Sequence, residues 1–116
     1  MTTEFDQAGA LAFVGGDDAL LHTVLQAFLD SAQAPLDAFL RAVATEDRQG
    51  VRSYLHRLTP TLQIIATPSL NELLHNLHEQ WRSDAPISAT QRQQSELLGQ
   101  RIRMLLVQVA DYQDAD

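Results

Sequence analysis

The sequence predicts an all-α protein, an antiparallel up-down four-helix bundle with a short N-terminal lead-in helix. Apolar residues recur in steps of three and four over several long segments, which is the spacing of an amphipathic helix. Proline, glycine and capping residues separate these segments, so the connections are expected to be short. No stretch alternates polar and apolar residues as a half-buried strand would. Long amphipathic helices with short connections are typical of a bundle.

Residues 4–13 are expected to form the lead-in, which a glycine pair ends. Asp17 is a suitable N-cap for a long apolar-periodic segment over residues 17–45. Pro35 interrupts that segment, and two interpretations remain open. The segment is either one helix kinked at the proline or two helices joined just before it.

The capping residues at their N-termini predict where the remaining helices begin. Thr45 is expected to cap the second long helix, and Thr67 with Pro68 supplies an N-cap and first-turn pair for the third. Ser88 and Gln91 fit a capping box, in which the Gln91 side chain reaches back to the Ser88 amide. The second long helix has its apolar residues in one narrow stripe. This stripe consists of Val51, Leu55, Leu58, Leu62 and Ile65.

Length and charge limit the possible functions. A chain of 116 residues is expected to form one domain over residues 1–116. The formal charge is −7 and lysine is absent, which disfavours binding to nucleic acid or to an anionic membrane surface. The absence of cysteine excludes disulfides and thiol chemistry. No glycine-rich phosphate loop, serine nucleophile motif or calcium loop is present.

Hydropathy and the N-terminal sequence bear on location. No apolar run approaches the length of a membrane span. The first ten residues are acidic and lack the apolar region of a signal peptide. A cytoplasmic location is therefore expected.

His56 is the candidate functional residue. On a helical wheel it lies about 140° from the centre of the apolar stripe, so it is expected to face outward. An exposed histidine is ordinarily a solvated surface residue. Here its neighbours suggest a small docking surface, in which Ile64 is expected to be an apolar side chain facing water. The same outer face carries Arg52, Thr59, Pro60, Gln63 and Ile64.

Pro60 lies inside the same predicted helix, four residues after His56. A proline in a helix interior costs roughly 3 kcal/mol, because it lacks the N–H that would bond the carbonyl four residues back. A bend away from the outer face would keep the apolar stripe on the core. The compact ring of Pro60 would also leave the space above His56 open to a partner.

The other histidines are weaker candidates. His75 and His78 are three residues apart, a spacing that could place two ligands on one metal ion. No third strong ligand is evident, so no metal site is predicted. His22 is expected to be isolated and solvated.

These features resemble the histidine-containing phosphotransfer (HPt) domain of two-component phosphorelays, over about residues 5–82. In that family's motif a histidine is followed by leucine, lysine and glycine, and a second glycine comes later. His56 and Leu58 match this motif. Thr59 stands in place of the lysine, Pro60 in place of the first glycine and Ala66 in place of the second. Further matching positions are Gly15-Gly16-Asp17, Leu20-Leu21, Phe28, Leu36, Leu40, Asp47, Val51, Arg57 and Leu70.

The resemblance implies that His56 accepts a phosphoryl group from a receiver-domain aspartate and passes it to another receiver. The implied partners are response-regulator receiver domains and a hybrid sensor histidine kinase. The domain itself would bind no cofactor and would not be an enzyme, because the receiver supplies Mg²⁺. Arg52 and Arg57 are expected to replace part of the missing lysine's charge. Thr59 and Pro60 would support the site, and Gln63 and Ile64 would contact the partner.

Two alternatives remain open at this stage. The chain could bind receivers without being phosphorylated, since Thr59 and Pro60 depart from the family motif. It could also be an unrelated metal-binding bundle. Acid-labile phosphate on His56 would separate the first alternative from a phosphocarrier, and metal retained through dialysis would identify the second.

Overall fold

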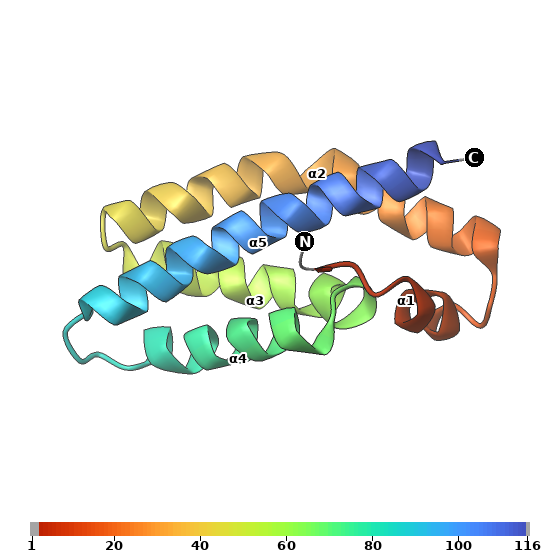
Figure 1. Cartoon of the computed structure of the whole chain (residues 1–116). Coiled ribbons are helices and arrows are strands. Elements are labelled where there is room, and N and C mark those ends of the chain that lie inside the picture. Colours follow the sequence, from red (N-terminus) through yellow and green to blue (C-terminus); the bar gives the residue numbers. More distant parts are fainter. Residues whose placement is uncertain (1–2, 116) are drawn as a thin grey trace.

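The computed structural model describes residues 3–115, which form α-helices and no strand (Figure 1). The all-helical prediction is confirmed for these residues. Within them, no helix is both long and apolar enough to cross a membrane. The helices are α1 (Gln7–Phe13), α2 (Asp18–Ala44), α3 (Arg48–Ile65), α4 (Pro68–Arg82) and α5 (Ala89–Asp114).

Helix α2 continues without a break through Pro35, which decides between the two interpretations of this segment. Asp17 caps it as predicted, because its carboxylate accepts a hydrogen bond from the Leu20 N–H at 3.0 Å. Gly15 and Gly16 both have left-handed φ angles, of 69° and 79°, which glycine adopts at little cost. The glycine pair therefore ends α1 and turns the chain into α2.

The N-cap of α3 is Asp47, so the prediction of Thr45 is wrong. Asp47 accepts a hydrogen bond from the Gly50 N–H at 3.0 Å. Thr45 instead ends α2, and its hydroxyl donates to the Arg41 carbonyl at 2.9 Å. Both side chains are able to cap a helix, and the point at which α2 ends decides which of them does.

The starts of α4 and α5 are as predicted, with one difference. Thr67 accepts from the Leu70 N–H, and Pro68 occupies the first turn of α4. Ser88 accepts from the Gln91 N–H at 3.0 Å. The return bond of the capping box, from the Ser88 N–H to the Gln91 side-chain oxygen, is not formed; the Gln91 side chain is buried, and its Nε2 has no partner within the described residues.

Each of the four long helices packs against two of the other three. Helix α2 packs on α3 and α5, α4 also packs on α3 and α5, and α1 lies against α2 and α3. The predicted stripe of α3 is buried at every position, at 0–7% exposure. Trp81 is fully buried, and its indole N–H donates to the Ser95 hydroxyl at 2.9 Å. Phe39 stacks on Tyr54 with ring centroids 4.7 Å apart.

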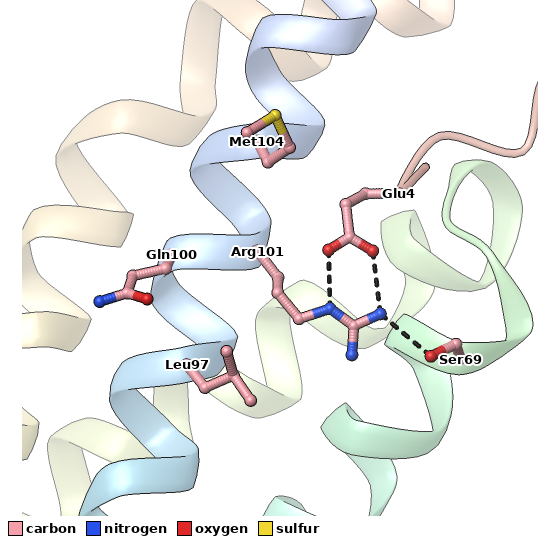
Figure 2. Close-up of a pocket in the computed structure, with 6 residues that line it drawn as sticks. All are labelled: Glu4, Ser69, Leu97, Gln100, Arg101 and Met104. Atoms are coloured by element: carbon pink, nitrogen blue, oxygen red, sulfur yellow. Dashed lines mark hydrogen bonds and ion pairs between the residues drawn. The ribbon is translucent and has the colours of Figure 1, made fainter. Parts of the chain in front are cut away.

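A buried ion pair that the sequence did not predict holds the N-terminal segment in place. The Glu4 carboxylate is 2% exposed and accepts from Arg101 Nε at 2.6 Å and Nη2 at 2.9 Å (Figure 2). Arg101 also donates to the Ser69 hydroxyl at 3.1 Å. The hydrogen bond to Glu4 raises the pKa of Arg101. An open pocket of about 460 Å³ lies beside this pair, bordered by Leu97 and Met104.

Backbone contacts complete the attachment of this segment. The Glu4 and Phe5 N–H groups both donate to Gln108 Oε1 of α5, at 2.8 and 3.0 Å. The Thr67 N–H donates to the Glu4 carbonyl at 2.9 Å. The segment before α1 therefore links α5 to the turn between α3 and α4.

We expect Arg101→Met to lower the free energy of unfolding by about 3 kcal/mol, because it leaves the Glu4 carboxylate buried and unpaired. Urea denaturation measures the change. The matched control is Arg103→Met, which removes an exposed arginine 3.7 Å from Asp37 and should cost at most about 1 kcal/mol. Equal losses in the two variants would contradict the special role of the Glu4 pair.

Candidate functional site

His56 lies on the outward face of α3. Its side chain is exposed, whereas the nearby Leu55 and Leu58 of the buried stripe are 0% and 7% exposed. Pro60, one turn further along, is also exposed. Helix α3 continues through the proline, so the His56 carbonyl lacks the N–H that an ordinary residue at position 60 would offer. The sequence predicted the outward direction of His56 correctly.

His56 lies on the α3–α4 seam, the line along which these two helices face each other. Three contacts fix the register of the seam. Arg52 bonds the last carbonyls of α4, the ring of His56 meets that of His78, and Asn71 donates to the Leu62 carbonyl at 2.9 Å. Residue numbers rise along α3 as they fall along α4, so the helices are antiparallel. His56 and His78 meet near the middle of the seam.

The two imidazoles are arranged edge to face. Their ring centroids are 6.5 Å apart and their planes are inclined at 73°. His78 is half-buried, whereas His56 is exposed. No hydrogen bond or ion pair joins His56 to any other residue in the part of the chain that the structure describes. His56 is therefore free to react with an incoming group.

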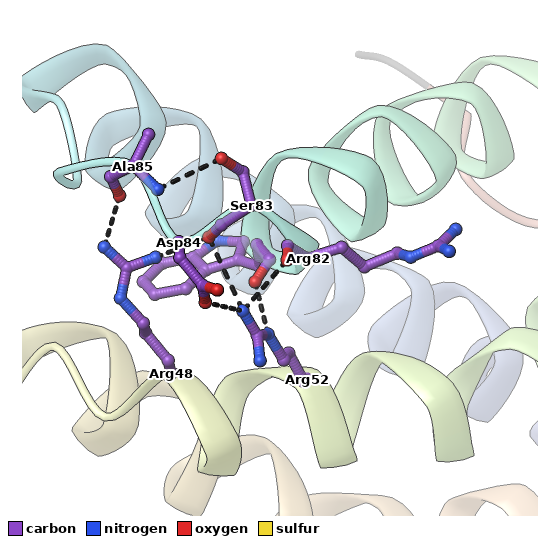
Figure 3. A network of polar contacts seen from close by, with 7 residues as sticks. Arg48, Arg52, Arg82, Ser83, Asp84 and Ala85 are labelled. Atoms are coloured by element: carbon purple, nitrogen blue, oxygen red, sulfur yellow. Dashed lines mark hydrogen bonds and ion pairs between the residues drawn. The ribbon is translucent and has the colours of Figure 1, made fainter.

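Arg52 has different partners from those expected of a charge beside His56. Its Nε donates to the Trp81 carbonyl, and its Nη2 donates to the Arg82 carbonyl at 3.0 Å and to Asp84 at 3.2 Å (Figure 3). Arg48 bonds the Ser83 carbonyl at 2.7 Å in the same network. The last carbonyls of a helix have no partner within it. Arg52 therefore caps the C-terminus of α4.

Arg57 is exposed and lies on the α2 side of His56. Together with Pro35 and Tyr54 it borders two shallow grooves between α2 and α3, of about 140 and 260 Å³. No ion pair joins Arg57 to another residue within residues 3–115. Burial raises the pKa of Tyr54 above its usual value, and the positive charge of Arg57 offsets this by a smaller amount.

The remaining predicted residues are only partly as expected. Gln63 is exposed, but Thr59 is half-buried and its hydroxyl donates to the Leu55 carbonyl at 2.7 Å. Ile64 was expected to face water, and this is wrong: it is half-buried and packs against the core. The wheel of an isolated helix omits the surface that neighbours supply, and α1, α2 and α4 all pack on α3.

Of the other histidines, His22 has surroundings that differ from the prediction. His75 is exposed on α4. His22 is not isolated: its ring stacks on Tyr112 with centroids 5.2 Å apart, and Nδ1 lies against Gln113 Oε1. No group of three or more His, Cys, Asp or Glu side chains that could hold a metal ion occurs among the described residues.

No family model, curated protein or solved structure matches this chain.

The two arginines that flank His56 should differ in their effect on stability. Arg52→Ala removes hydrogen bonds to the last carbonyls of α4 and should cost about 1–2 kcal/mol of unfolding free energy. Arg57→Ala removes an exposed side chain without an ion-pair partner and should change stability by less than about 0.5 kcal/mol. Chemical denaturation of both variants is the measurement. A larger loss of unfolding free energy for Arg57→Ala than for Arg52→Ala would contradict this prediction.

Tyr54 should make stability depend on pH in alkaline solution. The unfolded phenol loses its proton near pH 10, while the folded one retains it because its pKa is raised. Ionisation of Tyr54 therefore has no effect on stability below about pH 10. Above that pH it lowers the free energy of unfolding by up to about 1.4 kcal/mol per pH unit. Urea denaturation at several alkaline pH values tests this. In Tyr54→Phe the decline should be shallower, and an unchanged slope would refute the assignment.

Proposed function

We propose that this chain is an HPt-like phosphocarrier, in which His56 accepts a phosphoryl group from a receiver-domain aspartate and passes it to another receiver. The observation that carries the proposal is the exposed, unbonded imidazole of His56 on the face of α3 opposite the buried stripe. We also propose that the helices form an up-down four-helix bundle. The pairwise packing of α2, α3, α4 and α5 supports that arrangement.

The proposed transfer needs a neutral imidazole. Histidine in water is largely neutral near pH 7, so one ring nitrogen has a free lone pair. That lone pair attacks the phosphorus of an aspartyl phosphate, and a nitrogen–phosphorus bond forms. The bond from phosphorus to the aspartate oxygen breaks, and its electrons remain on the carboxylate. The other ring nitrogen keeps its proton, and the reverse sequence passes the group to the next aspartate.

The receiver would supply the rest of the machinery. Its Mg²⁺ and its own charges stabilise the phosphoryl group during transfer. This domain therefore needs no cofactor and is not an enzyme by itself. The proposed partners are response-regulator receiver domains and a hybrid sensor histidine kinase in the cytoplasm. The formal charge of −7 disfavours nucleic acid and anionic membranes as partners.

We place the docking face around His56, Pro60 and Gln63, which are all exposed on α3. Arg57 adds an unpaired positive charge on the α2 side, suited to an acidic receiver site. Ile64 contributes only the part of its side chain that the core leaves accessible. Arg52 is committed to the end of α4 and is not part of the proposed face.

One observation favours a second candidate, a receiver-binding module that is not phosphorylated. Thr59 replaces the lysine of the family motif, and its hydroxyl is bonded to the Leu55 carbonyl. Position 59 therefore offers no positive charge to a phosphoryl group on His56. The two candidates differ in whether acid-labile phosphate accumulates on the protein.

We expect His56→Gln to abolish phosphoryl acceptance from phosphorylated receiver domains while leaving the fold intact. His56 is exposed, and surface substitutions usually change stability by no more than about 0.5 kcal/mol. The measurement is acid-labile phosphate, mapped to a residue by mass spectrometry. Circular dichroism checks the fold, and His75→Gln is the matched control because His75 is also exposed.

Acceptance by the wild type and by His75→Gln, but not by His56→Gln, would support the phosphocarrier. Receivers that bind the wild type without transferring phosphate would support the second candidate. Phosphate that persists in His56→Gln would show that another residue is the acceptor.

A further inference from the structure

We infer that His78 is a positioning residue of the phosphoryl site, and that its ring N–H donates a hydrogen bond to a phosphoryl group held on His56. This inference deepens the proposed function and rests on it. It assigns to α4 the role that the sequence led us to expect of Arg52 and Arg57 on α3.

The two rings lie close together without being bonded to each other. Their centroids are 6.5 Å apart in an edge-to-face orientation, and no hydrogen bond joins them. A phosphoryl group on a ring nitrogen of His56 would extend its oxygens into the space beside His78. A nitrogen donor on His78 would bond such an oxygen at about 2.7–3.2 Å.

Nearby polar side chains are engaged elsewhere or lie on another side. Arg52 is bonded to the end of α4, and the Thr59 hydroxyl is bonded to the Leu55 carbonyl. Arg57 borders the grooves on the α2 side. The ring of His78, by contrast, lies beside the ring of His56.

The position of His78 is fixed by the structure around it. Its side chain is half-buried, so it has fewer conformations to lose than an exposed residue would. Arg52 ties α3 to α4 on one side of the histidine pair, and Asn71 ties them on the other side through the Leu62 carbonyl. These cross-links hold the separation of the two helices where the rings meet.

The chemistry of the pair fits this role. A neutral imidazole has one N–H donor, a protonated imidazole has two, and a phosphoryl group offers three acceptor oxygens. Hydrogen bonds to a charged acceptor are stronger than those between neutral groups. The nitrogen–phosphorus bond stays on His56, and His78 forms no covalent bond.

Chemical phosphorylation tests the inference without a receiver. Phosphoramidate transfers its phosphoryl group to histidine: the new nitrogen–phosphorus bond forms on the ring and ammonia leaves. The lifetime of phosphate on each histidine is then followed by mass spectrometry after the reagent is removed. Exposed His75 on α4 is an internal reference in the same molecule.

We expect phosphate on His56 to outlast phosphate on His75 by about tenfold, equivalent to about 1.4 kcal/mol. His78→Ala should shorten the His56 lifetime to that of His75. His78→Gln should restore most of the lifetime, because its amide also donates a hydrogen bond. His75→Ala should leave the His56 lifetime unchanged, and circular dichroism confirms that each variant is folded.

Equal His56 lifetimes in the wild type and in folded His78→Ala would overturn the inference. So would failure of His78→Gln to restore the lifetime, or accumulation of phosphate on His78 itself. The expected lifetimes together with no transfer to or from any receiver would refute the phosphocarrier proposal while leaving the hydrogen bond from His78 supported.

Discussion

Burial of the apolar stripe on α3 is the constraint on which the rest of the structure depends. All five of its side chains are at most 7% exposed, and each fully buried aliphatic side chain contributes about 1.5–3 kcal/mol. Because successive residues on a helix are separated by about 100°, burying this stripe turns the opposite face toward solvent. His56, Pro60 and Gln63 lie on that face. The exposure of the candidate acceptor is thus a consequence of core packing on the same helix.

Across the seam between α3 and α4, a side chain of each helix donates hydrogen bonds to backbone carbonyls near the end of the other. Arg52 of α3 donates to the last carbonyls of α4, and Asn71 of α4 donates to the Leu62 and Ala66 carbonyls at the end of α3. Each helix thus supplies a polar side chain to carbonyls near the end of the other, where such groups lack some or all of their partners within the helix; the Leu62 carbonyl also accepts from the Ala66 N–H. The same bonds fix how closely the helices approach near His56. Helix capping and the geometry of the candidate site are therefore set by the same residues.

Two helices carry an interior proline, and both prolines lie away from the fully buried core. Pro35 in α2 is half-buried and Pro60 in α3 is exposed. Each removes one hydrogen bond from its helix, which is tolerable where water can reach the carbonyl left without a donor. The compact ring of Pro60 lies one turn from His56. Pro35 borders the grooves that also contain Arg57.

The sequence by itself determined the helices, the buried stripe of α3, the outward direction of His56, and the caps Asp17, Thr67 and Ser88. These features depend on periodicity and on hydrogen bonds that span a single turn. Tertiary structure decided which polar groups meet, as in the Glu4–Arg101 ion pair, whose partners are 97 positions apart. It also gave Arg52 its carbonyl partners and brought His78 to His56. Helical periodicity gives the face on which a side chain lies, but its contacts depend on the neighbouring helix and on the register in which that helix packs.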